Sequence, residues 1–223
     1  MSLLSKHIFI SKDPSQVLDL QKPIDNAGGI LYARAFIRFE SSNAETTPYT
    51  DIIFFSSPRS VNYYLQHHSI NANTRIGCVG KSTAHQLVKF GFEPNFVGAD
   101  HRSIDEIAED FKEFAENSSV LFPVSNISLG TIASKIHKEK RTVIEVYRTI
   151  FDSITIGSFD VYIFTSPSNV RSFLLKNNVA KDALVIAWGN STEQELIQSG
   201  IHCKKLGTPS LECLIEKLES ERF

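Results

Sequence analysis

The chain has 223 residues, of which 42% are hydrophobic and 22% charged, and its formal net charge is -2. This composition is that of a globular protein with one large domain or two of about 100 residues each. The charge gives no support for a nucleic-acid partner, which needs a strongly basic face. Three cysteines without a C-x-x-C pattern favour a reducing compartment. We find no signal-peptide pattern and no membrane-length apolar run, so we expect a cytoplasmic protein with no membrane partner.

The first 50 residues predict a strand over 7–11, a long extended stretch over 30–40 and a linker-like segment over 41–50. The next segment alternates short apolar strands with amphipathic helices, which is the pattern of a parallel sheet with right-handed crossovers. Its strands are expected at 52–55, 75–79 and 95–97, and its helices at 61–68 and 84–90. Because these strands are almost continuously apolar, we expect both of their faces to be buried.

Four further elements follow, namely a helix over 104–115, a strand over 119–125, a helix over 131–139 and a strand over 141–149. The last strand alternates in polarity, which predicts that one of its faces is exposed. Its alternation places Val143, Glu145, Tyr147 and Thr149 on one face. As an isolated residue, Tyr147 is an ordinary strand aromatic. Its functional interpretation is a phenol that keeps its proton at neutral pH and acts as a weak general acid.

The rest of the chain repeats the earlier strand–helix segment at an offset of 109 residues, so that Asp51 aligns with Asp160. Strands are expected at 161–164, 183–188 and 203–206, and helices at 170–177, 193–198 and 211–218. The identical residues fall on turn glycines and helix starts, where backbone geometry restricts residue choice. "FSSPRSV" becomes "FTSPSNV", and "GKST" becomes "GNST". The repeat predicts two similar α/β lobes, each a parallel sheet flanked by helices.

Both repeated motifs follow a strand and begin a helix, so they lie at the sheet edge where open α/β sheets bind ligands. Ser57 and Ser166 each precede a proline, and a serine cap followed by proline is a common helix start. The remaining first-turn N–H groups and the helix dipole favour a carboxylate or phosphate. These helix starts have two interpretations, an anion-binding site or helix caps alone. The repeat does not decide between them, because a duplicated fold also duplicates its caps.

Other chemical motifs are absent. "VGKST" lacks the earlier glycine of a P-loop, where Arg75 stands instead. The chain has no G-x-G-x-x-G fingerprint, no G-x-S-x-G elbow and no H-E-x-x-H, and its histidines lack metal-ligand spacing. We therefore expect neither an ATPase nor a metal site.

Six motifs in order resemble the uroporphyrinogen-III synthase family, and together they span most of the chain: "FFSSPRSV", "VGKSTA", "LFPVSN", "VYRT", "FTSPSNV" and "GNST". The resemblance implies two α/β lobes joined by a two-stranded β ladder. One lobe would combine residues 1–34 with 150–223, and the other would span 42–141. Segments 35–41 and 142–149 would form the ladder, with Tyr147 at the cleft between the lobes.

The resemblance also implies a hydro-lyase reaction without a metal or organic cofactor. Linear hydroxymethylbilane would lose water and close to uroporphyrinogen III, with ring D inverted through a spiro intermediate. Tyr147 would be the catalytic acid. The residues implied for substrate binding are Lys12, Ser57, Arg59, Thr83, Asn126, Ser166, Ser191 and Thr192. A monomer that receives its substrate from hydroxymethylbilane synthase would fit this pathway, and eight substrate carboxylates would suit the helix starts.

The alternative is a two-lobed cytosolic binding or regulatory protein for an anionic metabolite, without chemistry. Such a protein would be stabilised by its ligand and would show no isomer selectivity.

Overall fold

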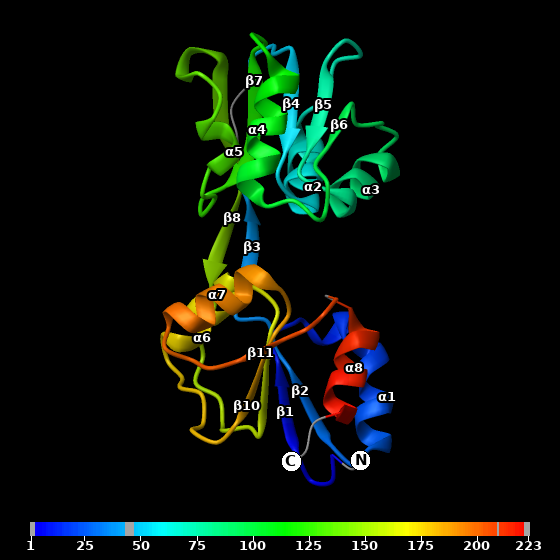
Figure 1. Cartoon of the computed structure of the whole chain (residues 1–223), viewed down its shortest axis with the longest axis vertical. Coiled ribbons are helices and arrows are strands. Elements are labelled where there is room, and N and C mark those ends of the chain that lie inside the picture. Colours follow the sequence, from blue (N-terminus) through cyan, green and yellow to red (C-terminus); the bar gives the residue numbers. More distant parts are fainter. Residues whose placement is uncertain (1–2, 43–46, 209, 221–223) are drawn as a thin grey trace. The chain divides into compact units, whose positions relative to one another are not determined.

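The computed structural model describes residues 3–42, 47–208 and 210–220. The chain divides into two compact units (Figure 1). Unit 1 comprises Met1–Arg38 with Ile150–Phe223, and unit 2 comprises Phe39–Thr149. In the described residues, none of the helices is long and apolar enough to cross a bilayer.

Unit 1 contains a five-stranded sheet in the order β11-β10-β9-β1-β2, and every strand pair in it is parallel. Its elements are β1 (His7–Ile10), η1 (Pro14–Gln16), α1 (Leu18–Asn26), β2 (Ile30–Ala33), β9 (Val161–Phe164), α6 (Pro167–Leu174), β10 (Leu184–Ala187), α7 (Asn190–Gln198), β11 (Lys204–Lys205) and α8 (Leu211–Ser220).

The second sheet has six strands in the order β3-β8-β7-β4-β5-β6. Its elements within unit 2 are β4 (Ile52–Phe55), α2 (Pro58–His67), β5 (Arg75–Cys78), α3 (Lys81–Lys89), β6 (Phe96–Val97), α4 (Ile104–Ala115), β7 (Val120–Ser125), α5 (Thr131–Ser134) and η2 (Lys138–Lys140). Strands β3 (Ile37–Ser41) and β8 (Arg141–Phe151) extend across the boundary of the two units in the chain.

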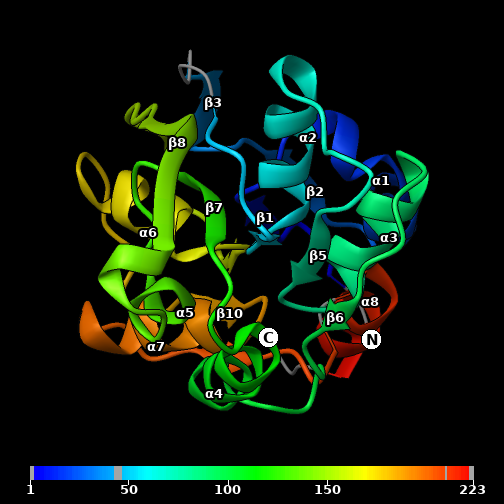
Figure 2. The same ribbon diagram turned by 90° about the horizontal axis from the view of Figure 1, so that it is seen from above.

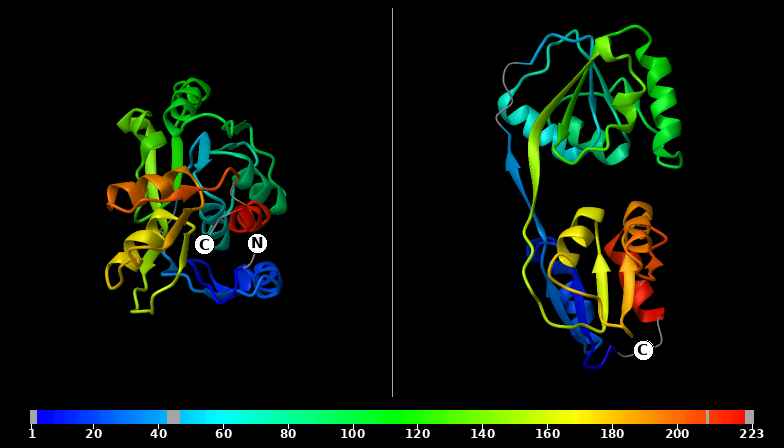
Figure 3. Two further views of the ribbon diagram at one scale, coloured as in Figure 1. Left: turned by 60° about the horizontal axis from the view of Figure 1, so that its bottom comes forward. Right: turned by 90° about the vertical axis from the view of Figure 1, so that its left-hand side faces the viewer.

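Strands β3 and β8 form the predicted two-stranded ladder, and they run side by side in the right panel of Figure 3. Their pairing is antiparallel. At one end the Ser42 N–H donates to the Val146 carbonyl at 3.0 Å, and at the other the Asp152 N–H donates to the Phe36 carbonyl at 2.8 Å. The antiparallel direction distinguishes β3 from the parallel strands beside it.

The two sheets are the same sheet in permuted chain order. Reading β9, β10, β11, β1 and β2 against β4, β5, β6, β7 and β8 gives identical strand orders. The helices correspond in the same way, so that α6, α7, α8 and α1 take the places of α2, α3, α4 and α5. The predicted repeat is thus confirmed, and it extends to all five strands. Gly91 and Gly200 end equivalent helices at φ 82° and 74°, a left-handed conformation that favours glycine.

Each sheet is buried on both faces by pairs of helices, as its apolar strands predict. In unit 2, α4 and α5 pack on the face that presents Phe54 and Phe122, while α2 and α3 cover the face of Phe55 and Leu121 (Figure 2). In unit 1, α1 and α8 cover one face and α6 and α7 the other. These layers leave the sheet edges, rather than the faces, for ligands.

The predicted extended stretch over 30–40 is wrong as a single element, because it splits into β2 and β3, which belong to different sheets. The break lies at Phe36, which is fully buried among the aromatic residues of the α6 side of unit 1. Its N–H donates to the side-chain oxygen of Asn169 at 2.8 Å instead of to a neighbouring strand. Burial of this ring thus redirects the chain.

The helix predicted over 131–139 is also too long. Helix α5 ends at Ser134, and a short 3-10 turn, η2, follows it. The Arg141 guanidinium donates to the Ala133 carbonyl at 2.8 Å, which satisfies a terminal group of the helix. This hydrogen-bond donor at the end of α5 comes from the first residue of β8.

Strand β8 departs from the predicted alternation at a β-bulge. Val124 pairs with Glu145 and the next residue, Ser125, pairs with Tyr147, so Val146 is the extra residue. Val146 and Tyr147 therefore both contribute to the core on the α2 side, together with Ile144. The prediction that Tyr147 shares a face with Val143 is wrong, because a strict period of two does not survive a bulge.

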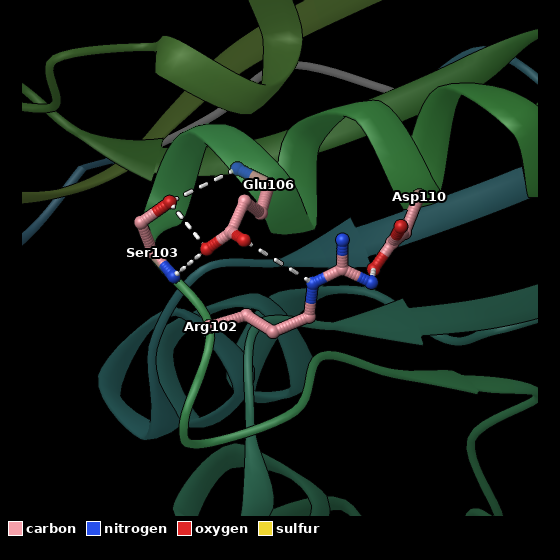
Figure 4. A network of polar contacts seen from close by, with 4 residues as sticks. All are labelled: Arg102, Ser103, Glu106 and Asp110. Carbon is pink, nitrogen blue, oxygen red and sulfur yellow. Dashed lines mark hydrogen bonds and ion pairs between the residues drawn. The ribbon is translucent and has the colours of Figure 1, made fainter.

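Helix α4 begins with the polar network shown in Figure 4. Ser103 accepts a hydrogen bond from the Glu106 N–H at 3.3 Å, and the Glu106 carboxylate accepts from the Ser103 N–H at 2.7 Å, which makes a capping box. Arg102 adds an ion pair to Asp110 at 2.7 Å. Bonding to Ser103 lowers the pKa of Glu106, so the bonds favour the ionised carboxylate.

We predict that Ser103→Ala lowers the free energy of unfolding by about 1 kcal/mol, because it removes a helix cap. Chemical denaturation at neutral pH measures the change. Ser158→Ala is the matched control, since Ser158 is exposed in a loop. Equal stability of the two variants would contradict a stabilising role for the cap.

Candidate active site

The predicted site residues flank the point in each sheet where the strand order reverses. In unit 2 this point lies between β4 and β7, and in unit 1 between β9 and β1. Ser57 and Asn126 follow the first pair of strands, and Ser166 and Lys12 follow the second. Open α/β sheets bind ligands beyond the carboxyl ends of their strands at this reversal. The permuted repeat therefore gives each unit its own candidate site.

Ser57 caps α2 within a capping box. Its hydroxyl accepts from the Ser60 N–H at 3.0 Å, and the Ser60 hydroxyl accepts from the Ser57 N–H at 3.3 Å. The Ser57 hydroxyl therefore acts here as an acceptor. Its own O–H has no acceptor among the described residues, so it can donate to a carboxylate.

Ser166 occupies the equivalent position at the start of α6, where Asn169 replaces Ser60. Its hydroxyl accepts from the Asn169 N–H at 3.3 Å and from the Asn169 side-chain amide at 3.0 Å. Two accepted bonds use both lone pairs of a hydroxyl and leave its hydrogen to donate. Asn169 also accepts from the buried Phe36 N–H, so it ties this helix start to the chain ahead of β3.

Thr83 lies in the first turn of α3 and is fully buried, and its hydroxyl lacks a hydrogen-bond partner in the described structure. Leaving a buried hydroxyl unpaired costs free energy, and full burial keeps this group from direct contact with a ligand in this conformation. The start of α3 already holds one carboxylate, because Asp100 accepts from the Lys81 N–H at 3.3 Å and pairs with its ammonium at 3.2 Å. These bonds lower the pKa of Asp100.

Ser191 and Thr192 lie in the first turn of α7, the unit 1 counterpart of α3. Ser191 is exposed, whereas Thr192 is buried. The residue before the helix is Gly189, and it has no side chain that caps the helix start. A helix start without a side-chain cap keeps unpaired N–H groups for an anion. The turns at Gly80 and Gly189 therefore differ, since among the described residues a carboxylate bonds to the start of α3 and none bonds to the start of α7.

Tyr147 lies against two other aromatic rings in unit 2. Its ring stacks on that of Tyr63 with 5.1 Å between centroids and 15° between planes. Phe39 meets the same ring edge-on at 6.1 Å. The Arg59 guanidinium lies 3.5 Å from the centre of the Phe39 ring, which is cation–π geometry. Three elements, β3, α2 and β8, thus bring Arg59 and Tyr147 onto one aromatic group.

Asn126 binds the backbone of β8 two residues beyond Tyr147. Its side-chain oxygen accepts from the Thr149 N–H at 2.8 Å, and its amide donates to the Thr149 carbonyl at 3.4 Å. Its own N–H donates to the Tyr147 carbonyl at 3.3 Å. Asn126 therefore continues the β7–β8 pairing past the bulge and fixes the strand that carries Tyr147.

Lys12 follows β1 in unit 1, and its ammonium lies 4.6 Å from the centre of the Trp188 ring. The side chain is half-buried, and this burial lowers its pKa. The contact joins the ends of β1 and β10, which are both neighbours of β9.

Phe39, Tyr63 and Trp188 contact the predicted site residues but were not predicted from the sequence. No motif marks them, because each is recognised only by the ring or cation that it meets. Tyr63 had a partial signal, since it lies on the predicted helix that follows Ser57. Among the described residues, no group of three or more histidine, cysteine or acidic side chains is placed to hold a metal ion.

Comparison with known proteins identifies the family. The model of the uroporphyrinogen-III synthase HemD family matches residues 19–207. This chain belongs to the uroporphyrinogen-III synthase family. A uroporphyrinogen-III synthase of Chlorobaculum parvum is 29% identical over 174 residues, which cover 67% of this chain and 70% of that protein.

Solved structures agree in fold. The uroporphyrinogen-III synthase of Helicobacter pylori superposes with a TM-score of 0.72 at 18% identity, and the match covers 98% of this chain and 100% of that one. A mutant uroporphyrinogen III synthase of Thermus thermophilus gives 0.64 at 12% identity, with 96% of each chain covered. The α/β architecture predicted from the sequence is therefore that of the uroporphyrinogen-III synthase family.

We predict that Asn126→Ala lowers the free energy of unfolding by about 1 to 2 kcal/mol, because it leaves backbone groups of the buried Thr149 unpaired. Thermal unfolding monitored by circular dichroism measures this loss. Asn73→Ala, at an exposed turn position, serves as the control. If both variants unfold at the same temperature as the parent, Asn126 does not stabilise β8.

Proposed function

We propose that this chain catalyses the uroporphyrinogen-III synthase reaction, in which hydroxymethylbilane loses water and closes to uroporphyrinogen III with ring D inverted. The observation that carries the proposal is the family match over residues 19–207, which includes every residue singled out for the site except Lys12. The fold and the motif positions are consistent with this activity. The enzyme is then a lyase of tetrapyrrole biosynthesis, and its substrate is a linear tetrapyrrole with eight carboxylates.

Carboxylate recognition would use the ends of both sheets. The O–H groups of Ser57 and Ser166 are free to donate, and the uncapped start of α7 adds backbone N–H groups. Arg59 and Lys12 would contribute one positive charge each. Such donors suit a ligand whose carboxylates are distributed around its rings, since each contact neutralises one charge locally.

Tyr147 would act as the general acid. Its phenol would donate a proton to the departing hydroxyl of the substrate, so that water leaves and an electrophilic methylene carbon remains. The proton lost when the last pyrrole regains its aromaticity would restore the phenol, which balances the cycle. The stack on Tyr63 and the edge contact with Phe39 restrict the ring of Tyr147. A proton donor held in one orientation accelerates the reaction more than a mobile one.

We further propose that units 1 and 2 serve as the two lobes of the family, with segments 35–41 and 142–149 as the ladder that joins them. A cytoplasmic monomer that takes its substrate directly from hydroxymethylbilane synthase fits this assignment, because hydroxymethylbilane closes without a catalyst to the wrong isomer. Catalysis then depends on holding both ends of the chain-like substrate as well as on acid chemistry.

The deciding measurement is the isomer ratio of the product. Purified full-length protein, supplied with hydroxymethylbilane and no added metal, is expected to give the type III isomer, whereas the uncatalysed control gives the other isomer. Chromatography after oxidation to the porphyrins separates the two. A ratio equal to that of the control contradicts the enzyme. Ligand-induced stabilisation without isomer selectivity would instead support the alternative, a binding or regulatory protein for an anionic metabolite.

For Tyr147→Phe we predict a fall in kcat of about 100-fold with KM little changed, because only the proton donor is lost. Steady-state kinetics measures both constants. Tyr63→Phe is the control, since it removes a hydroxyl from the ring that stacks on Tyr147 and keeps the stack. Unchanged kcat in Tyr147→Phe, or an equal fall in the two variants, would remove Tyr147 from the acid role.

A further inference from the structure

The contact between Lys12 and Trp188 crosses the end of a third strand. Lys12 follows β1 and Trp188 follows β10, and β9 lies between these two strands. The residues that follow β9 are Thr165 and Ser166, which begin α6. The ammonium and the indole therefore meet beyond the end of β9, at the point where the strand order of unit 1 reverses.

Hydrogen bonds hold the backbone next to Lys12 and the backbone of Trp188 in place. The Ser11 hydroxyl accepts from the Thr165 N–H at 2.8 Å, and the Thr165 hydroxyl donates to the Ser11 carbonyl at 2.7 Å, so the residue before Lys12 is fastened to β9. The backbone N–H of Trp188 donates to the Phe164 carbonyl at 2.9 Å. The indole also packs on the core under α1 and α8. Trp188 is thus a rigid surface on which the flexible lysine side chain lies.

Among the described residues of unit 1, Lys12 is a cation without a counter-charge. None of the described carboxylates pairs with its ammonium, although Lys6 and Lys205 in the same unit do form ion pairs. The side chain is half-buried, and this burial lowers its pKa because the charged form loses water. A partly desolvated cation without a carboxylate is costly on its own, and its attraction to the ring offsets part of that cost.

A lysine that lies on an aromatic ring is more available to an anionic ligand than a lysine that is paired with a carboxylate. A carboxylate neutralises the ammonium, so an incoming anion must displace it. A ring face attracts the cation through its quadrupole and leaves the charge and its N–H donors available on the other side. The arrangement on Trp188 therefore preserves a positive charge for an anion that binds beside the start of α6.

We infer that Trp188 is a positioning residue that holds Lys12 as an unpaired cation. Lys12 then binds a carboxylate of the substrate beyond the carboxyl ends of the strands of unit 1. The inference rests on the proposed function for the identity of the substrate. The carboxylate site itself needs only the geometry of unit 1. Trp188 takes no part in the chemistry and acts through the ammonium.

A double-mutant cycle tests the coupling of the two side chains. Lys12→Met is expected to raise KM about tenfold with kcat little changed, because a charge-assisted bond to the bound substrate is lost. Trp188→Leu is expected to raise KM in the same direction, and Trp188→Phe to restore most of the loss by supplying another ring. The double variant should be no worse than Lys12→Met alone. Full additivity of the two changes, or an unchanged KM in Trp188→Leu, would overturn the inference.

A second measurement needs no catalysis, because the chain has a single tryptophan, Trp188. The fluorescence of the full-length protein is followed during titration with 1,2,3,4-butanetetracarboxylate, which does not absorb at the wavelengths used. Emission should change with saturation in the parent protein and in Lys22→Met, which removes an exposed lysine of α1. Lys12→Met should show no saturable change.

The outcomes separate the two proposals. An identical response in Lys12→Met, or no response in the parent protein, overturns the carboxylate site at Trp188. A response that depends on Lys12 supports it even if the isomer assay fails, in which case the site stands and the proposed function falls. Thermal unfolding of Trp188→Phe and Trp188→Leu shows whether a change in KM reflects loss of the fold.

Discussion

Parallel strand pairing is the constraint from which the candidate site follows. Because every strand pair other than β3–β8 is parallel, their carboxyl ends meet at one edge of each sheet. Each crossover helix then begins at that edge, so its free N–H groups and its capping residue collect there. The permuted repeat applies the constraint twice. Parallel pairing is therefore enough to bring serine caps and glycine turns that are far apart in the sequence to the same sheet edge of a unit.

The repeat was readable from the sequence because backbone geometry restricts the same positions in both copies. Strands 52–55 and 161–164 were predicted at their observed bounds, since short apolar runs between turn residues have few alternatives. The two helices that follow the serine caps were predicted to start at 61 and 170, which is too late, because they begin at Pro58 and Pro167. A helix that begins at a proline after its serine cap has a polar first turn, so its apolar pattern begins a turn later than its backbone does.

What the sequence could not predict depends on contacts between distant segments. The bulge at Val146 moves Tyr147 to the opposite face of the strand, and no local sequence pattern predicts such an extra residue. The break at Phe36 depends on Asn169, which lies more than a hundred residues away in the chain. At the end of the shortened α5, the Ala133 carbonyl accepts a hydrogen bond from Arg141 of the next strand. In the last two cases a side chain from another element supplies the partner of a backbone group, which local propensity cannot predict.

Each unit's candidate site has one basic residue on an aromatic ring, an environment that motif matching cannot describe. Arg59 lies on Phe39 in unit 2 and Lys12 on Trp188 in unit 1, and neither has a carboxylate partner among the described residues. Lysines elsewhere in the chain, such as Lys81 and Lys135, are paired with acidic groups. A chain with more acidic than basic residues has ample carboxylates to neutralise these two cations. Placing both on rings instead keeps their charge unbalanced, which is the condition for attracting a ligand with several carboxylates.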